Sequence, residues 1–451
     1  MKVVVIGGGV GGLGAGYEFA KAGHEVALFE ASDRLGGQVR TFEIGGGRIE
    51  NFYHHLFKSD TVVTELIHEL GLGDDLEWIH SKVGFLSGGK IYPFVGAIDL
   101  LRFTPVSLIT RIRLGLAALW LRRQHDWKQY EGKRAKDWIL RAVGREGYEK
   151  VWGPLLRAKF GPHADDVSLV WFWGKIYLRF ASRPPGLRGL FAKEQLGYLR
   201  GSFGRLVDAL GEAIRARGGT AEAGRRAQQV LTRDGHVTGV CVARPDGTTE
   251  DITADVVIAA VPSLLLPRLV PDLDAAYRET LDKVDFQWAT VLVLALDRPL
   301  SYIYWLTVTD PDVPFVVAVE QTNFRPASEY GGQHVVYFSN YTDPGDPIVD
   351  EDEEQVFTRY EAYIKRINPA FDRSWIVGRW LFKDRAGQPI VHSRYHEVIP
   401  PLRTPTEGLY LCNTTQVYPE DRGQNYAIRL GQQVARLAMA DFGARQGAGD
   451  K

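Results

Sequence analysis

Three glycines near the amino terminus have the spacing found in sites that bind a nucleotide diphosphate. Gly7, Gly9 and Gly12 form the pattern G-x-G-x-x-G, and Glu30 follows 18 residues after the last of them. In such a loop the first glycine permits a tight turn, the second lets the backbone approach a pyrophosphate, and the third allows close helix packing. A carboxylate at this distance accepts hydrogen bonds from ribose hydroxyl groups. The chemistry indicated is dinucleotide binding.

Such glycines need a strand before them and a helix after them, and the flanking residues predict both. Val3–Ile6 is a short apolar, β-branched run, typical of a buried parallel strand. Leu13 and Ala20 share one face of a helix, and Val26–Phe29 resembles a second strand that ends at Glu30. The sequence therefore predicts a complete βαβ unit. The helix N-terminus would offer unpaired N–H groups and a positive dipole end to the diphosphate.

A second glycine pair follows the ribose carboxylate. With this pair, Gly36 and Gly37, the stretch resembles the flavoprotein superfamily of monoamine oxidase, protoporphyrinogen oxidase, phytoene desaturase and UDP-galactopyranose mutase. The resemblance implies FAD as cofactor, with the glycine pair running against it. An arginine usually follows the pair in that family, and Gln38 stands in its place here. This departure leaves the pyrophosphate one cation short unless Arg34 or Arg40 supplies it.

The resemblance extends to the far end of the chain. A strand over 408–413 and a helix that continues through Leu437 are similar to the family's last strand, loop and helix. There, Asp421 would meet the ribityl and diphosphate region, and the backbone of 425–427 would face the flavin pyrimidine ring. A helix N-terminus aimed at that ring would stabilise the negative charge of reduced flavin. Cys412 lies within the strand and does not match the cysteine that tethers flavin in some relatives, so non-covalent FAD is expected.

The predicted cofactor site draws on several parts of the chain. Strands within 218–230, 237–242 and 255–262 resemble those on the adenine side, where the backbone of Ala227 would pair with adenine. The full set implied by the resemblance comprises Gly7, Gly9, Gly11, Gly12, Glu30, Ala31, Ser32, Gly36, Gly37, Gln38, Tyr53, His54, Ala227, Asn413, Asp421, Asn425, Tyr426 and Ala427.

Candidate substrate and catalytic residues lie between these segments. His54 and His55 belong to a stretch similar to one that passes the flavin in relatives. Each is a candidate proton donor or hydrogen-bonding group because imidazole titrates near neutrality, although a lone histidine is more often structural. Lys159 lies in a segment similar to the one leading from the helical lobe to the flavin, and Trp380 is a candidate for the cavity border or for core packing. Adjacent histidines point apart, so no metal site is expected.

The absence of a lysine that is usual in the amine oxidases of this family changes the reaction that we expect. Amine oxidases of this family usually carry a lysine on the strand corresponding to 287–299, and none occurs there. The favoured function is therefore FAD-dependent oxidation of a small-molecule substrate, most similar to protoporphyrinogen oxidase or desaturase chemistry, with hydride passing from a C–H bond to flavin N5. No second nucleotide-binding unit is found, so oxygen, a quinone or another diffusible acceptor would reoxidise the flavin.

Two alternatives stay open. A mutase-like isomerase of a nucleotide sugar would need anion-binding arginines, for which Arg157, Arg179 and Arg183 are candidates. A non-catalytic FAD-binding protein would bind flavin that no metabolite reduces.

Composition limits the remaining possibilities. The 451 residues include 54 basic and 55 acidic side chains, a balance that disfavours a nucleic-acid partner. Hydrophobic residues make up 45% and charged residues 24%, as expected for a globular chain with a large core. Two cysteines indicate a reducing, cytoplasmic compartment. No uncharged apolar run is long enough to span a membrane, and the glycines of the apolar amino terminus disfavour a secretory signal.

Peripheral membrane contact, at the inner face of the membrane, is a further possibility. Between Leu100 and Trp120, leucines and isoleucines alternate with arginines in a basic amphipathic pattern. Such a pattern is compatible with a membrane surface, but also with a core-facing helix that has a solvated basic face.

The expected architecture is α/β in class, α+β overall. A discontinuous Rossmann-like FAD-binding domain is predicted from 1–85, 198–262 and 400–445, and a mixed helical and antiparallel-sheet substrate domain from 86–197 and 263–399. The predicted active site lies between them. Residues 446–451 are expected to form a tail.

Overall fold

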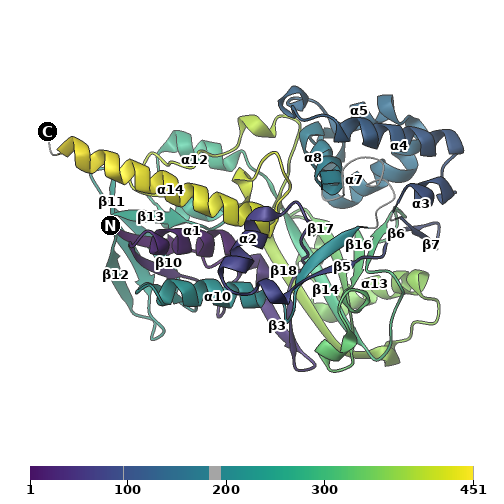
Figure 1. Ribbon diagram of the computed structural model, residues 1–451, viewed down its shortest axis with the longest axis horizontal. Helices are drawn as coiled ribbons and strands as arrows, with labels where there is room; N and C mark the ends of the chain where they lie inside the picture. Colours follow the sequence, from purple (N-terminus) through teal and green to yellow (C-terminus); the bar gives the residue numbers. More distant parts are fainter. Residues whose placement is uncertain (95, 182–193, 450–451) are drawn as a thin grey trace.

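The computed structural model describes residues 1–94, 96–181 and 194–449. A parallel sheet covered by helices lies at the end that holds both termini, and a second sheet with a group of helices lies at the other (Figure 1). The combination of helices and sheets confirms the predicted α/β class. Among the described helices, none has the length and apolar character needed to cross a membrane.

The five-stranded sheet near the termini is entirely parallel. Its order is β19-β13-β1-β2-β9, so the first strand along the chain is central and later strands are added on both sides. In open sheets of this kind, ligands bind where the strand order changes direction, beyond the carboxyl ends of the strands. The strands are β1 (Lys2–Ile6), β2 (Glu25–Phe29), β9 (Thr220–Glu222), β13 (Val256–Ala259) and β19 (Leu409–Leu411).

Both faces of this sheet are covered, which explains the unbroken apolar run of β1. Val3 and Val5 belong to the core on one face, whereas Val4 and Ile6 belong to the core on the other. Covered on both faces, a parallel strand has no need for the alternation of polar and apolar residues. The first face is covered by α1 (Val10–Lys21), α10 (Gly204–Arg215) and α14 (Gln424–Gly449), and α2 (Thr61–Glu69) packs on α14 in the same core.

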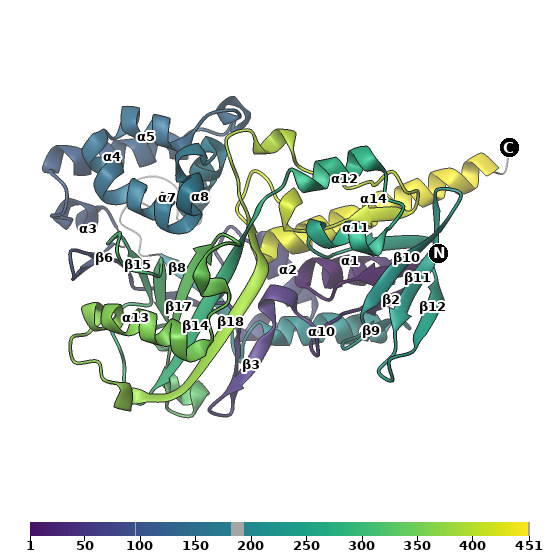
Figure 2. The ribbon, with the colours of Figure 1, turned by 180° about the vertical axis from the view of Figure 1, so that it is seen from behind.

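The opposite face is covered by a small antiparallel sheet and two helices, seen from behind in Figure 2. The helices lie within 263–399, the stretch predicted to belong to the substrate domain, yet Leu266 and Tyr277 pack in the same core as Val4. The elements are β10 (Ala227–Arg233), β11 (His236–Ala243), β12 (Thr249–Thr253), α11 (Leu266–Leu269) and α12 (Ala275–Asp282).

The second large sheet has seven strands in the order β18-β14-β17-β16-β15-β6-β7. Neighbours are antiparallel as predicted, except for the parallel pair β6 and β15. The domain boundary predicted between residues 85 and 86 divides β6. Local sequence patterns do not show the pairing of β6 with β15, so they do not indicate that β6 belongs to this sheet. The strands are β6 (Val83–Ser87), β7 (Lys90–Pro93), β14 (Phe286–Leu296), β15 (Trp305–Val308), β16 (Val317–Glu320), β17 (His334–Thr342) and β18 (Ile376–Pro389).

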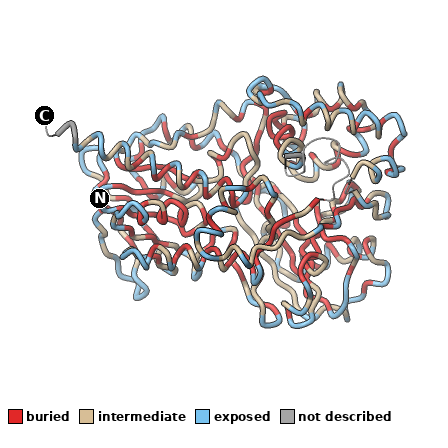
Figure 3. Tube along the Cα trace, in the orientation of Figure 1, coloured by how far each residue is buried: buried red, intermediate tan, exposed pale blue. Residues whose placement is uncertain are grey.

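One face of this sheet packs on α13 (Glu353–Ile367), whose first turn is capped by Asp352. A helical group lies beyond the sheet and forms a core of its own, rich in aromatic residues. Figure 3 shows buried segments running through both ends of the molecule. The helices of this group are α3 (Ala97–Arg102), α4 (Leu108–Arg122), α5 (Ala135–Ala142), α6 (Arg145–Gly147), α7 (Gly153–Phe160) and α8 (Leu169–Ala181).

Two short strand pairs, β3 (Thr41–Ile44) with β4 (Gly47–Glu50) and β5 (Leu76–His80) with β8 (Gln195–Leu199), complete the sheets. At the far end of the chain, α14 continues to Gly449. Residues 446–449, expected to form part of a tail, are therefore helical.

Candidate cofactor and substrate site

A cavity of about 1270 Å³ extends from the carboxyl ends of the parallel strands to the helical group. Ordinary ligand pockets have volumes of roughly 300–1,000 Å³, so this cavity has space for a large cofactor together with a substrate. Ile6 of β1 and Phe29 of β2 line it, as do Ala260 and Cys412, which directly follow β13 and β19, as expected at the point where the strand order changes direction.

The first glycine loop lines one end of the cavity. Gly7 has a φ of +106°, and a Cβ atom there would lie 2.4 Å from the carbonyl oxygen of Ala260. A Cβ atom on Gly12 would lie 2.1 Å from the carbonyl oxygen of Gly7. Both positions therefore require glycine. Because Gly9 and Gly11 also line the cavity, the N-terminus of α1 is open to a bound anion.

The second glycine pair packs directly on the first loop. The N–H group of Gly36 donates to the carbonyl oxygen of Gly8 at 2.8 Å. A Cβ atom on Gly37 would lie 3.0 Å from the Cα atom of Gly9. The backbones thus meet without intervening side chains, and both stretches face the same cavity.

Glu30 is held at the end of β2 by hydrogen bonds from the backbone. Its carboxylate accepts from the N–H group of Gly8 at 2.7 Å and from that of Ser32 at 2.8 Å. Ser32 itself does not line the cavity, and its contact is with Glu30. Ala31 and Ala227 do line it, so the residues predicted for the ribose and adenine region share one end of the cavity.

The two arginines considered as a source of the missing cation lie elsewhere. Arg34 pairs with Glu43 and Arg40 with Asp33, each at 3.8 Å, and neither arginine lines the cavity. Gln38 does line it, and its side-chain amide donates to a carboxylate oxygen of Asp384. The cavity-lining cations outside the predicted set include Arg226, at the start of β10, and Arg268, on α11.

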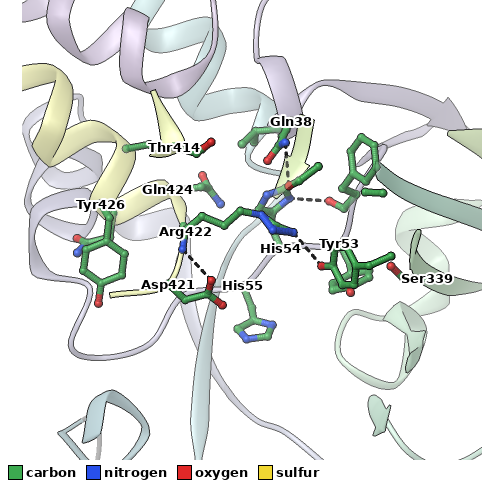
Figure 4. A pocket seen from close by; sticks show the side chains of 18 of the residues that line it. Gln38, Tyr53, His54, His55, Ser339, Thr414, Asp421, Arg422, Gln424 and Tyr426 are labelled. Carbon is green, nitrogen blue, oxygen red and sulfur yellow. Dashed lines mark hydrogen bonds between the residues drawn. The ribbon is translucent and has the colours of Figure 1, made fainter. Parts of the chain in front are cut away.

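The stretch with Tyr53, His54 and His55 crosses the middle of the cavity (Figure 4). The Nδ1 atom of His54 lies 2.6 Å from the carbonyl oxygen of Phe52, and burial lowers the pKa of His54 to about 4. The Nδ1 atom of His55 lies 3.1 Å from the hydroxyl oxygen of Tyr304, and burial lowers its pKa to about 3. Both imidazoles are therefore neutral near pH 7, which disfavours a role as imidazolium acid.

Four charged side chains meet beside this stretch, and we refer to Lys159, Lys175, Asp421 and Arg422 as the charged cluster. The Nζ atom of Lys159 lies 3.3 Å from an oxygen of Asp421, and Lys175 forms an ion pair with the same oxygen. Burial opposes ionisation of Asp421, but the neighbouring cations hold its pKa below the usual range. Burial lowers the pKa of Lys159 to about 7, against the opposing effect of Asp421.

Other predicted residues are placed by structural contacts. The side-chain amide of Asn413 donates to the carbonyl oxygen of Val261 at 2.9 Å and so fixes the end of β19. Asn425 accepts a hydrogen bond from the N–H group of Val63 at 3.1 Å. These two residues line the cavity, as do Tyr426 and Ala427. Trp380 packs against Phe42, with ring centroids 5.1 Å apart, and is not among the cavity-lining residues.

The part of the cavity that runs into the helical group is apolar, and we refer to it as the apolar arm. Its walls come from β6, α3, α4, α7 and α8. The lining side chains include Phe85, Phe94, Leu100, Phe103, Leu114, Leu119, Leu155, Leu156 and Phe172.

Several site residues were not predicted. Lys175, Ser339 and Tyr341 line the cavity from α8 and β17, and no motif marks them. Arg422 directly follows the predicted Asp421, so its place in that segment could have indicated that it also belongs to the site. Thr414 and Gln424 also line the cavity.

The arginines considered for a mutase do not assemble into one set. Arg179 lines the cavity and pairs with Glu194 at 2.9 Å, whereas Arg157 borders a smaller, separate pocket. Arg183 lies outside the described residues.

Comparison with known proteins places these features in a family. The family model described as flavin containing amine oxidoreductase matches residues 10–438. The chain belongs to this family. Its cofactor is accordingly FAD, and the protein is an FAD-dependent oxidoreductase.

Individual relatives differ in their reactions. Zeta-carotene desaturase from Synechocystis sp. is 23% identical, with 98% of each chain covered. A putative protoporphyrinogen oxidase from Exiguobacterium sp. 255-15 has a TM-score of 0.74 at 18% identity, covering 97% of this chain and 99% of the other. A reduced UDP-galactopyranose mutase has a TM-score of 0.73 at 16% identity, covering 97% and 95%. At these identities the two structures establish the fold.

Proposed function

We propose that this enzyme oxidises a C–H bond of a largely apolar small molecule, with the FAD held non-covalently in the main cavity. The observation that carries the proposal is the continuity between the glycine-lined end of the cavity and its apolar arm. When bound, the flavin supplies the hydride acceptor at N5. Two relatives are named as a zeta-carotene desaturase and a putative protoporphyrinogen oxidase, names that refer to the oxidation of large molecules, which agrees with the size of the arm.

The residues of the chain bind and orient both molecules. The glycine loops and Glu30 are proposed to hold the diphosphate and ribose, and the N-terminal turn of α14 to face the flavin ring. Tyr53 and the neutral His54 form a wall at the junction with the apolar arm. We assign no catalytic base, because the hydride acceptor belongs to the cofactor. Oxygen, a quinone or another diffusible molecule is proposed as the final electron acceptor.

The first experiment is an absorption spectrum of the purified protein, followed by anaerobic addition of candidate substrates. We expect the bands of oxidised flavin, and bleaching by a polyene or a porphyrinogen. Bleaching by a primary amine alone would favour amine oxidation. Failure of every C–H donor to bleach the flavin, combined with conversion of a nucleotide sugar after dithionite reduction, would overturn the proposal in favour of a mutase.

We also propose that the enzyme docks on an anionic membrane surface through α3 and α4. Seven large apolar side chains on these helices are 44–72% exposed, and the opposite side of α4 lines the apolar arm. Arginines on both helices complement anionic lipid headgroups. Docking would let a lipid-soluble substrate enter without crossing water. The exposed side chains are Ile98, Leu101, Leu108, Ile109, Ile112, Leu116 and Trp120.

Co-sedimentation with vesicles tests this docking surface. The protein should bind vesicles that contain phosphatidylglycerol more strongly than pure phosphatidylcholine vesicles, and added salt should weaken the binding. The double variant Ile109→Asp and Leu116→Asp should reduce binding at least tenfold. Leu264→Asp, at an exposed apolar position outside these helices, is the matched control. Equal binding by both variants would contradict the proposal.

A further inference from the structure

The charged cluster contains more positive than negative charge. Among the described residues of the cluster, Asp421 carries the one carboxylate, and both lysines direct their Nζ atoms to the same oxygen of it. The guanidinium group of Arg422 donates to the hydroxyl group of Tyr341 at 2.8 Å and to the side-chain oxygen of Gln388 at 3.3 Å. Both acceptors are uncharged. Since charges removed from water are usually paired, the cluster has capacity for a further anion.

The position of this surplus charge is specific. The side chain of Lys159 is 20% exposed and that of Lys175 is 42% exposed, so Lys159 is half-buried whereas Lys175 reaches solvent, and both line the main cavity with Asp421 and Arg422. Gln424 and Asn425, which follow shortly after Arg422, begin α14 and line the same cavity. The cluster therefore lies on the wall between the apolar arm and the turn proposed to face the flavin.

The same helices supply the apolar arm and the cations. On α7, Leu155 and Leu156 line the arm, and Lys159 follows one helical turn later. On α8, Phe172 lines the arm, and Lys175 follows at the same spacing. Residues three or four apart share a helix face. Each helix thus presents an apolar surface that ends in a positive charge.

We propose that Lys159, Lys175 and Arg422 bind a carboxylate of the substrate, so that the substrate is an amphiphile with an apolar body and an acidic end. This inference rests on the proposed function for the identity of the arm as the substrate site. A carboxylate would accept hydrogen bonds from the two ammonium groups and the guanidinium group, at about the strength expected for charge-assisted pairs. The apolar body would occupy the arm, and the acid would fix its distance from the flavin.

Binding of matched ligands to the FAD-loaded enzyme tests the subsite without requiring turnover. Decanoate, 1-decanol and decyltrimethylammonium have the same chain and differ in the charge of the end group. By calorimetry we expect decanoate to bind at least tenfold more tightly than decanol, and the cation to bind least. Equal binding of the acid and the alcohol would overturn the proposal.

Variants identify the residues responsible. Lys175→Gln and Arg422→Gln should each remove most of the preference for decanoate while leaving decanol binding within about twofold, whereas Lys175→Arg should retain it. Lys133→Gln, at an exposed lysine of the helical group outside the cavity, is the control. Thermal unfolding and flavin content establish that each variant is folded. An equal loss of acid and alcohol binding in the variants would overturn the assignment.

Proton uptake gives a second readout. The groups that face Lys159 are Asp421, Lys175, Arg422 and Tyr341. Burial lowers the pKa of Lys159 to about 7, against the effect of Asp421, so its ammonium group is partly deprotonated above neutral pH. A bound carboxylate favours the charged form. Decanoate binding at pH 8 should therefore take up a fraction of a proton, measured by calorimetry in buffers of different ionisation enthalpy. Lys159→Gln should abolish this uptake, and uptake that persists in the variant would contradict a direct contact.

The cluster has one competing role, which is to balance the charge of reduced flavin. In that case the variants would shift the flavin midpoint potential and leave the preference for decanoate unchanged, which would overturn the proposal. An enzyme that prefers decanoate yet oxidises no C–H donor would retain the carboxylate subsite and contradict the proposed oxidation.

Discussion

The side-chain nitrogen of Gln38 lies 2.9 Å from an oxygen of Asp384, and it lies 3.2 Å from the carbonyl oxygen of Ala386. These hydrogen bonds join the second glycine stretch to β18 of the seven-stranded sheet, 346 residues away. The position at which relatives of the family usually carry an arginine is therefore occupied by a residue that connects the glycine-pair loop to the seven-stranded sheet. Both the second glycine stretch and β18, which this contact holds together, contribute residues to the cavity wall.

Replacement of Gln38 by alanine should weaken this connection. A hydrogen bond to a charged group contributes about 1.5–3 kcal/mol, and Asp384 keeps the N–H group of Ala386 as a partner, so we expect a loss of about 1–2 kcal/mol in unfolding free energy. Affinity for FAD should also fall several-fold, because the glycine pair loses its support. Urea unfolding and FAD titration measure the two effects. Gln433→Ala, at an exposed position on α14, should change neither.

Loss of the charge on Glu30 should weaken FAD binding more strongly. The carboxylate is held by Gly8 and Ser32 at the end of β2, in a position to accept from a ribose. Charge-assisted hydrogen bonds contribute about 1.5–3 kcal/mol, so Glu30→Gln should raise the dissociation constant for FAD roughly 10- to 100-fold. Flavin fluorescence on titration of the apoprotein measures this constant. The exposed Glu25 on the same strand is the control, and equal effects of Glu25→Gln and Glu30→Gln would refute a ribose contact.

A methyl group at Gly12 should disrupt the first loop. Its Cβ atom would lie 2.1 Å from the carbonyl oxygen of Gly7, which is backbone and cannot move without opening the turn. We expect Gly12→Ala to be purified with little or no FAD and with a lower melting temperature. Gly443→Ala has open space around it on α14 and should be neutral or stabilising by up to about 1 kcal/mol. Normal flavin content in Gly12→Ala would show that this close approach is not required.

The nucleotide-binding end was predictable because every local signal there agrees. Apolar strands, a glycine loop and a largely buried helix follow one another within thirty residues, and the structure has β1, α1 and β2 where they were expected. The strand and helix near the carboxyl end were also confirmed, as β19 and α14. The pattern of apolar residues within each of these short segments predicts its secondary structure.

The other part of the site depends on contacts between distant segments. Lys159, Lys175 and Arg422 come from two helices and a loop, and no spacing in the chain shows that they converge. The parallel pairing of β6 with β15 and the packing of Leu266 beneath β1 are likewise long-range. Trp380 was a candidate that the sequence could not place. An aromatic residue on a strand is equally compatible with a cavity wall and with the core contact that Trp380 makes to Phe42.

The stability of the enzyme should depend on pH through Glu50, which lies three residues before Tyr53. Its carboxyl group is buried and accepts from the hydroxyl group of Tyr198 at 2.7 Å and from the N–H group of Phe203 at 2.6 Å. Burial raises the pKa of Glu50 to about 7, although these hydrogen bonds oppose the shift. Between the ordinary pKa of 4.5 and about 7, the folded state binds more protons than the unfolded state. The contribution of Glu50 to stability is therefore present below this window and is lost as the pH rises through 7.

Urea unfolding of the wild type and of Glu50→Gln at pH 5 and pH 8 isolates this contribution, since other buried carboxyl groups titrate in both proteins. The wild type should lose about 2–3 kcal/mol relative to the variant between these two pH values. Glu43→Gln, at an exposed position on the neighbouring strand β3, should show no such change relative to the wild type. A constant difference between the wild type and Glu50→Gln would mean that Glu50 has the same charge in the folded and unfolded states across this range. In that case Tyr198 and Phe203 would stabilise a buried carboxylate beside the cavity.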